Sequence, residues 1–408
     1  MMRLLKLSIP FILIVSFLLL SCACSGQTEI LTPEPENLPE NIASTEKTDQ
    51  AVKILFVNVH KADSAIVLTG NTAFLIDTGT AESVPYLIGA LRYYGIQELE
   101  GVFLSHTHKD HIGGLKQICR MYPIRTVYRA FISENKKNGS NAIDSIAEDE
   151  GVPVSTLSAG DTLKIGDVLI ETIGPLVYNS DDDNDNSLVL MLNAYGRKIL
   201  MTGDMQFPEE ETLLSSEADL KADVLKVGNH GNPDATSVSF ARSVDPKLSI
   251  ISTDTEIDTD SANPRVFAAL SGSEIYTTEG TGFGVLLTIP QDGTIDISYP
   301  ERPSQDAQID IISADREQQM IVIRNTGSNM TDLSDAMLLS ERKGDLVCFP
   351  EGTSLEPGGE LTVSGYGMGG LFSFSQTDEP FSKKKQEHFL LYDRYGNLIS
   401  EITVGQEE

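Results

Sequence analysis

Short apolar runs separated by polar turns make up most of the chain from residue 52 onward. Apolar residues at helical spacing predict an amphipathic helix that includes Val84, Leu87, Ile88 and Leu91, and a second helix is expected over 113–121. Strand-like runs rich in Val, Ile, Leu and Phe cover 52–59, 65–68, 73–76, 102–104, 126–128, 168–172, 188–192, 199–202, 224–227, 248–252 and 285–289. Many strands with interleaved helices predict a layered α/β domain over residues 51–300.

A different pattern follows a Pro-rich break at residues 301–308. The remaining residues, 309–408, contain only short strand-like runs, and Gly- and Pro-rich turns separate them. The runs cover 308–312, 320–324, 336–339, 360–364, 389–392 and 398–403. This part of the chain is therefore predicted to be an all-β sandwich.

The N-terminus has the pattern of an export signal. Two basic residues precede an apolar run that ends at Leu20, and this run is too short to span a membrane comfortably. The segment Leu19–Cys24 resembles the lipobox of bacterial lipoproteins. The resemblance implies that residues 1–21 are a removed signal peptide and that Cys22, or alternatively Cys24, receives lipid on the outer face of the bacterial membrane. The other interpretation is an ordinary cleaved signal with incidental cysteines.

Charge and cysteine content narrow the possible partners. The chain has 30 Lys and Arg against 60 Asp and Glu, a formal net charge of −30, and residues 22–50 form a predicted acidic, Pro-rich linker. This balance disfavours tight binding of a nucleic-acid backbone, and it equally disfavours docking onto anionic lipid by charge. Beyond the leader only Cys119 and Cys348 remain, so no disulfide framework is expected.

The strongest chemical signal is a group of histidines directly after the strand-like run at 102–104. The segment Ser105–His111 holds three of the chain's six histidines together with Asp110. Neutral imidazoles and an ionised carboxylate crowded into one turn are ligands for a divalent metal, whereas their protonated forms would repel one another. The following Gly113 and Gly114 let the backbone pass close to this group. Imidazole and carboxylate ligands suit Zn²⁺, Mn²⁺ or Fe²⁺.

The spacing His-x-His-x-Asp-His resembles the signature of the metallo-β-lactamase fold, a four-layer αββα hydrolase with one or two metals. Supporting segments occur in that family's order, namely Leu75–Gly79, Leu200–Asp204 and Leu225–Gly231. Two further segments resemble the hydrolase domain of the ComEC branch of DNA-uptake proteins, namely Phe56–Ser64 and Asp185–Leu190. The resemblance covers about residues 52–290.

Carried over residue by residue, the resemblance implies a divalent metal, Zn²⁺ or Mn²⁺, held by His106, His108 and Asp204. A second metal would be held by Asp204 together with Asp110, His111 and His230. Asp110 is expected to orient the attacking water as the catalytic carboxylate. Other expected contributors support the ligand loops without binding metal, and these are Asp63, Asp77, Asn186 and Asn229.

Several of these positions leave alternatives open. Asp185 or Asn186 could contribute to the first metal, because this chain has no histidine before the Gly203-Asp204 segment. Asn229 replaces a histidine of the ComEC branch, and we expect this to weaken the second metal site. Asp63 and Asp77 could equally be strand-end caps. His60 replaces a glycine of the relatives and is expected to be an exposed loop histidine.

The C-terminal segment resembles the lamin-tail domain, an immunoglobulin-like β-sandwich. The segments that carry this resemblance are 321–327, 332–334, 349–358 and 391–397. It contains no predicted catalytic group, so we expect it to bind the cell envelope, a substrate or a partner protein.

Together these features predict a lipid-anchored, extracellular, metal-dependent hydrolase that is monomeric. A phosphodiesterase or nuclease is expected, acting on a short or transient phosphodiester because the acidic chain disfavours a tight grip on a polyanion. A hydrolase of another ester or amide remains an alternative, because one fold supports many chemistries. A non-catalytic or weakly active surface or competence accessory protein is the alternative from another functional class.

Overall fold

The computed structural model describes residues 50–134, 139–304, 307–365, 367, 369–374, 380–382 and 384–405. The predicted signal peptide, Cys22 with its alternative Cys24, and nearly all of the acidic linker lie outside these residues. Within the described part of the chain, no helix is both long enough and apolar enough to cross a membrane.

The first of two large sheets has eight strands. In spatial order these are β15 (Asp296–Ser298), β14 (Gly284–Ile289), β1 (Val52–Val57), β2 (Ala65–Thr69), β3 (Thr72–Ile76), β4 (Gly101–Leu104), β5 (Val127–Ala130) and β6 (Val154–Leu157). Strands β3 to β6 run parallel to one another. Their carboxyl ends therefore meet at one edge of the sheet.

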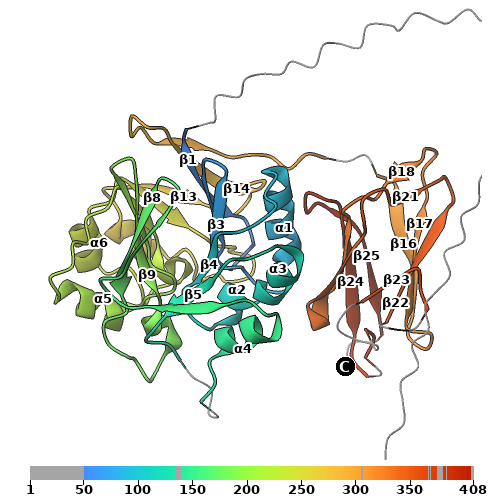
Figure 1. Ribbon diagram of the computed structural model, residues 1–408, viewed down its shortest axis with the longest axis horizontal. Helices are drawn as coiled ribbons and strands as arrows, with labels where there is room; N and C mark the ends of the chain where they lie inside the picture. The colour runs from blue at the N-terminus through green and yellow to red at the C-terminus, as the bar shows by residue number, and fades with distance from the viewer. Residues whose placement is uncertain are drawn as a thin grey trace, which may run out of the picture. The chain divides into compact units, whose positions relative to one another are not determined.

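The second sheet has seven strands and faces the first (Figure 1). Its spatial order is β13 (Glu274–Thr277), β12 (Leu248–Ile251), β11 (Val224–Lys226), β10 (Arg197–Met201), β9 (Val189–Ala194), β8 (Val168–Gly174) and β7 (Thr162–Ile165). Strands β10 to β13 are parallel, so their carboxyl ends also lie together.

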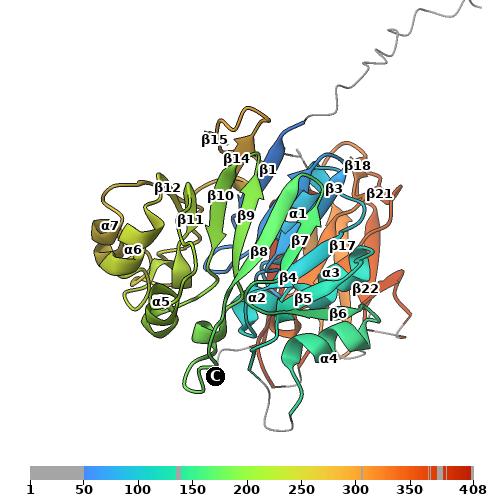
Figure 2. The same ribbon diagram turned by 60° about the vertical axis from the view of Figure 1, so that its left-hand side comes forward.

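Helices cover the outer face of each sheet and complete four layers (Figure 2). Helices α1 (Val84–Tyr93), α3 (Leu115–Met121) and α4 (Ala142–Asp149) pack on the first sheet, and α5 (Phe207–Leu214), α6 (Val238–Val244) and α7 (Pro264–Ala269) pack on the second. The residues of strand β4 are all apolar because both faces of the strand are buried. Val102 and Leu104 belong to the core under the helices, whereas Phe103 belongs to the core between the sheets.

The structure differs from the predicted elements in identifiable places. The helix expected over 113–121 is found as α3, which begins at Leu115, and an unpredicted short helix, α2 (Lys109–Ile112), precedes it, with Gly113 and Gly114 between them. A Cβ atom at Gly114 would collide with the Thr78 carbonyl, so the chain needs glycine there to pass this loop. The pattern also missed edge strands β6, β7, β13 and β15 and helices α4 to α7, because short elements with mixed exposure lack a clear apolar period.

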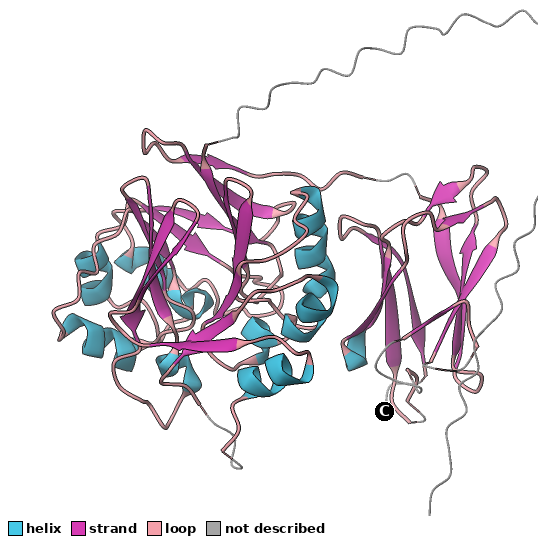
Figure 3. Cartoon of the chain, in the orientation of Figure 1, coloured by secondary structure: helices cyan, strands magenta, loops and turns pink. Residues whose placement is uncertain are grey.

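The C-terminal region consists mainly of strands (Figure 3) and includes one short 3₁₀ helix, η3 (Glu341–Lys343). One sheet contains β16 (Ile309–Asp315), β17 (Met320–Asn325), β22 (Glu360–Ser364) and β23 (Phe372–Ser373). Another contains β20 (Asp345–Cys348), β19 (Met337–Ser340), β24 (Glu387–Tyr392) and β25 (Leu398–Val404), and β18 (Thr331–Asp332) pairs with β21 (Ser354–Leu355). Ile321, Val363, Leu338 and Phe389 share one core, as in a β-sandwich. Cys119 and Cys348 are both free thiols.

Candidate metal centre

The predicted ligands lie where strands of both sheets end. The histidine segment leaves β4 of the first sheet and continues into α2. Asp204 follows β10, and His230 lies in η2 (Gly228–Gly231) after β11 of the second sheet. Because β10 and β11 are parallel neighbours, these two side chains emerge at the same edge.

Two of the histidine rings are oriented through Ser105 and Asp77. The Ser105 backbone N–H donates to Asp77 Oδ1 at 2.8 Å, and its hydroxyl donates to Asp77 Oδ2 at 2.9 Å. His111 Nδ1 lies 2.9 Å from the same Oδ2, and His106 Nδ1 lies 3.0 Å from the Ser105 hydroxyl. The Ser105 hydroxyl uses its hydrogen to donate to Asp77, so its oxygen accepts from His106 Nδ1. Asp77 Oδ2 accepts in the same way from His111 Nδ1. Both rings therefore carry hydrogen on Nδ1 and present the lone pair of Nε2.

His230 is oriented by the backbone of the second sheet. Its Nδ1 donates to the Ser252 carbonyl at 3.0 Å, because a carbonyl can only accept. The residue adopts φ 53° and ψ 19°, and Asn229 adopts φ 43° and ψ 49°, so two consecutive non-glycine residues are left-handed. Such a conformation persists only where the surroundings hold it in place. Here the Ser261 hydroxyl donates to the His230 carbonyl at 2.7 Å.

The oriented nitrogens converge on Asp204. Asp204 Oδ2 lies 3.0 Å from His111 Nε2, 3.4 Å from His230 Nε2 and 4.0 Å from His106 Nε2. Each of these three Nε2 atoms, and Asp204 Oδ1, is buried without a hydrogen-bond partner. Buried polar atoms are normally hydrogen-bonded. Three imidazole lone pairs and a carboxylate that converge without such bonds fit a divalent metal ion.

Asp110 and His108 lie on the more accessible side of this group. Asp110 Oδ2 is 3.4 Å from His230 Nε2, and its side chain is 28% exposed. The His108 ring is partly exposed and packs edge-on against His106, with ring centroids 4.6 Å apart. The structure thus brings all six predicted ligands to one place, with four buried and two reachable from solvent.

The buried groups around Asp204 have strongly shifted pKa values, in directions that differ from one group to the next. Burial and the neighbouring His111 lower the pKa of His106 to about 3, so this ring is neutral at physiological pH. Burial acts against protonation of His230, but Asp204 and Asp63 outweigh it and raise its pKa to about 9. Burial likewise opposes ionisation of Asp204, yet the adjacent His111 and His230 hold its pKa well below the usual range. Protons and a divalent cation therefore compete for the same lone pairs.

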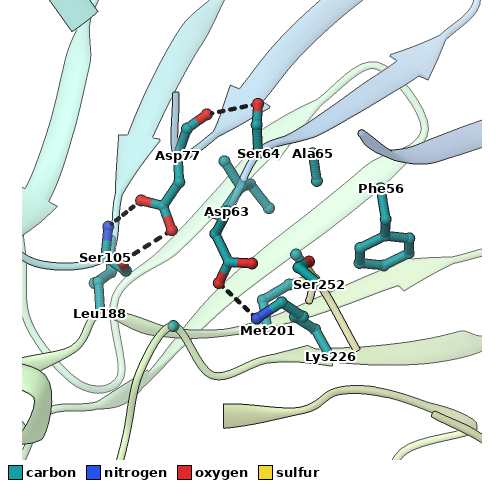
Figure 4. A pocket seen from close by; sticks show the side chains of 12 residues that line it. Phe56, Asp63, Ser64, Ala65, Asp77, Ser105, Leu188, Met201, Lys226 and Ser252 are labelled. Carbon is teal, nitrogen blue, oxygen red and sulfur yellow. Dashed lines mark hydrogen bonds and ion pairs between the residues drawn. The ribbon is translucent and has the colours of Figure 1, made fainter. Parts of the chain in front are cut away.

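Asp63 and Lys226 form an ion pair close to the metal ligands, and Figure 4 shows the pair. Asp63 Oδ2 is 4.0 Å from His111 Nδ1, and Asp63 Oδ1 is 4.0 Å from His230 Nδ1. The Lys226 ammonium donates to Asp63 Oδ2 at 2.5 Å. One Asp63 oxygen is also within 4.8 Å of ligand atoms of His111, Asp204 and His230, so the carboxylate lies beside the metal ligands as well as beside Lys226.

The loop before β9 supports the histidine segment through a residue that the sequence did not indicate. Asp183 Oδ2 accepts from the backbone N–H and the hydroxyl of Thr107 at 2.8 and 2.7 Å. Asn186 donates to Asp183 Oδ1 at 3.2 Å and accepts from the Asn179 N–H at 2.8 Å. Asp185 Oδ1 accepts from the backbone N–H groups of Gln206 and Glu209, at the start of α5.

The structure also places Asn229 and His60. The Asn229 amide donates to Asp234 Oδ1 at 2.9 Å, which supports the loop that carries His230. His60 lies apart from the six predicted ligands, with its side chain 45% exposed and its Nδ1 2.8 Å from Asp254 Oδ2.

Comparison with known proteins agrees with this geometry. Residues 58–255 match the family described as the metallo-beta-lactamase superfamily. These residues have the metallo-β-lactamase fold. The predicted α/β fold is therefore confirmed, and the family implies divalent metal ions, for which the buried Asp and His cluster provides a site.

The chain is similar to parts of two larger bacterial proteins. The chain is 27% identical over 252 residues to ComE operon protein 3 of Bacillus subtilis, covering 60% of this chain and 31% of the relative. It is 28% identical over 220 residues to Competence protein ComA of Neisseria gonorrhoeae, covering 53% of this chain and 28% of the relative. The chain thus spans less than a third of the length of either relative. Among solved structures, the metallo-beta-lactamase fold protein YhfI from Bacillus subtilis matches 58% of this chain and 99% of its own, with 13% identity and a TM-score of 0.41.

Proposed function

We propose that this protein is a lipid-anchored, extracellular phosphodiesterase or nuclease that depends on one or two divalent metals. The observation that carries the proposal is the convergence of three unpartnered Nε2 atoms on Asp204, with Asp110 and His108 at the solvent side. A buried set of lone pairs with accessible neighbours suits a metal that must also meet a substrate.

The chain's own residues would have distinct tasks in hydrolysis. When bound, a divalent cation would polarise the scissile group and increase the acidity of a water molecule. His106, His111 and His230 hold their Nε2 atoms toward Asp204, while His108 and Asp110 lie closer to the entrance. The neighbouring His230 holds the pKa of Asp110 below the usual range despite burial, so the carboxylate stays ionised and can accept a hydrogen bond from water and orient it there.

Two features favour a phosphodiester substrate of limited length. The relative from Neisseria gonorrhoeae is a competence protein by name, and the segments that resemble the ComEC branch of DNA-uptake proteins favour DNA, which is a phosphodiester. The net charge of −30 opposes tight binding of a long polyanion, so a short or transiently held diester fits better than a processively degraded strand.

A specific observation supports the alternative of another ester. A segment of 98 residues is 33% identical to atrochrysone carboxyl ACP thioesterase of Emericella nidulans, and it covers 32% of that protein. A metal site of this kind can serve a carbonyl ester as well as a diester.

The other parts of the chain complete the proposal. Cys22 would anchor the protein to the outer face of the bacterial membrane, and the acidic linker would hold the catalytic domain away from the lipid. The lamin-tail-like sandwich would bind the envelope, the substrate or a partner protein, with the chain monomeric.

A substrate panel on the purified full chain tests this proposal. Metal content is measured first, and the protein is then offered bis(p-nitrophenyl) phosphate, a short single-stranded DNA, and a thioester under Zn²⁺ and Mn²⁺. Diester cleavage that is lost in His108→Ala and Asp204→Asn, with folding unchanged, is the expected result. Thioester turnover alone would support the ester alternative, and metal binding without any turnover would support an accessory role.

A further inference from the structure

A buried lysine lies close to the metal centre. Lys226 is the last residue of β11, and its side chain is only 4% exposed. Its ammonium donates to Asp63 Oδ2 at 2.5 Å and to the Val227 carbonyl at 3.0 Å. Lysine is almost never fully buried without a partner, and Asp63, whose side chain is 6% exposed, is that partner.

The Asp63–Lys226 ion pair joins the two sheets close to the metal ligands. Asp63 belongs to the loop between β1 and β2 of the first sheet, whereas Lys226 belongs to the second (Figure 4). His111 comes from the first sheet and His230 from the second, and the Asp63 carboxylate lies 4.0 Å from Nδ1 of each ring. A single ion pair therefore lies close to both halves of the ligand set, and an Asp63 oxygen is also within 4.8 Å of Asp204.

We propose that Lys226 and Asp63 form a positioning pair that sets the affinity of the metal centre. Asp63 supplies negative charge next to the two rings, and Lys226 compensates this charge and holds the carboxylate through its bond to Asp63 Oδ2. The inference rests on the proposed function only in that the centre binds a divalent cation. Neither residue is itself a ligand in this account.

Asp63 and Lys226 carry opposite charges close to the metal centre, so removing them should change the affinity for a cation in opposite directions. Lys226→Met removes a positive charge and leaves the Asp63 carboxylate without compensation, so a cation should bind more tightly. Asp63→Asn leaves the Lys226 charge without compensation, so a cation should bind more weakly. Each change is expected to be on the order of tenfold in dissociation constant, the lower end of what residues supporting metal ligands contribute. A purely structural role would weaken binding in both variants.

The double variant Asp63→Asn/Lys226→Met separates this account from one in which Asp63 binds the metal directly. Both charges are then absent, so the affinity should return to within about threefold of the original value, because the two charge effects cancel. If Asp63 were a ligand, the double variant would remain weak, and the visible absorption of bound Co²⁺ would change because its coordination would change.

The test is Co²⁺ titration of the full chain, followed by visible absorption and by competition with a chelator. Lys198→Met is the matched control, since Lys198 is on the adjacent strand β10 and pairs with Asp219 at 2.7 Å on the surface. We expect tighter binding for Lys226→Met, weaker binding for Asp63→Asn, recovery in the double variant, an unchanged Co²⁺ spectrum throughout, and little effect of the control.

Several results would overturn the inference. Weaker or unchanged binding in Lys226→Met would do so, as would an altered spectrum in Asp63→Asn or a double variant that stays weak. A parent protein that binds no Co²⁺ would refute both this inference and the proposed function. Normal Co²⁺ binding with the expected pattern but no hydrolysis would refute the proposed hydrolase alone.

Discussion

Asp77 is not one of the predicted metal ligands, yet its carboxylate orients two of the histidine rings. Oδ2 accepts from the Ser105 hydroxyl and from His111 Nδ1, each at 2.9 Å, and Oδ1 accepts from the Ser105 N–H at 2.8 Å. Asp77→Asn retains one acceptor oxygen and replaces the other with an NH₂ group, which cannot accept either hydrogen bond. His111 would then have to move its hydrogen to Nε2, the atom that faces Asp204.

The size of this effect follows from the number of bonds lost. Two hydrogen bonds to a charged group contribute about 1.5–3 kcal/mol each. Burial raises the pKa of Asp77, so replacing the acid by a neutral amide relieves part of that penalty. A net loss of about 2–4 kcal/mol in the free energy of unfolding is expected, together with a fall of about 10- to 100-fold in metal affinity.

Urea unfolding and metal titration of Asp77→Asn measure both quantities. Asp161→Asn is the matched control, because Asp161 lies in an exposed turn where it accepts one bond, from the Ser158 N–H at 2.8 Å, which an amide oxygen can also accept. The control should change stability by less than about 0.5 kcal/mol. If Asp77→Asn bound metal as tightly as the parent protein, the ring orientation described above would be wrong.

Three further predictions concern other parts of the chain. Gly203→Ala should have a much lower melting temperature than the control Gly70→Ala. Both glycines are left-handed, but only at Gly203 would an added Cβ come within 2.7 Å of the Ser105 Cβ. Equal melting temperatures in the two variants would contradict this prediction. Burial, with Asp185 and Glu210 nearby, raises the pKa of Glu209 well above its usual value of about 4.5. Its contribution to stability is therefore full below about pH 4.5 and is lost as pH rises. Thermal melts of Glu209→Gln should show an advantage over the parent that grows as pH rises above about 5, and a constant difference would refute this prediction. Cys22→Ala should move the protein from the membrane fraction to the soluble fraction, and unchanged membrane association in cell fractionation would exclude this cysteine as the anchor.

The sequence predicted the parts of the site that depend on local spacing. Three histidines and an acid within one turn indicate a metal without any knowledge of the fold, and family resemblance added Asp204 and His230. Lys226 was missed because a lysine in a short apolar run can equally place its ammonium in solvent. Its position between apolar neighbours in the run 224–227 was the one signal that could have prompted a search for an acidic partner.

Contacts between distant segments were beyond the reach of the sequence. The ring of His230 is oriented by the backbone carbonyl of Ser252, and a carbonyl has no residue type that a pattern could reveal. The buried Asp183 carboxylate accepts hydrogen bonds from Thr107, a contact between segments 76 residues apart that no local pattern shows. The sequence predicted the layers of the fold, because most of their strands are strongly apolar. It did not predict the edge strands, because they are short and partly exposed.

The central claim is that His106, His111, His230 and Asp204 together hold a divalent metal that hydrolysis requires. Equilibrium dialysis of the full chain against Zn²⁺ or Mn²⁺, with elemental analysis and bis(p-nitrophenyl) phosphate turnover on the same samples, tests it most directly. The account predicts one or two ions per chain, with turnover that disappears on chelation and returns when metal is restored. Less than one ion per chain, with no turnover at any metal concentration, would contradict it.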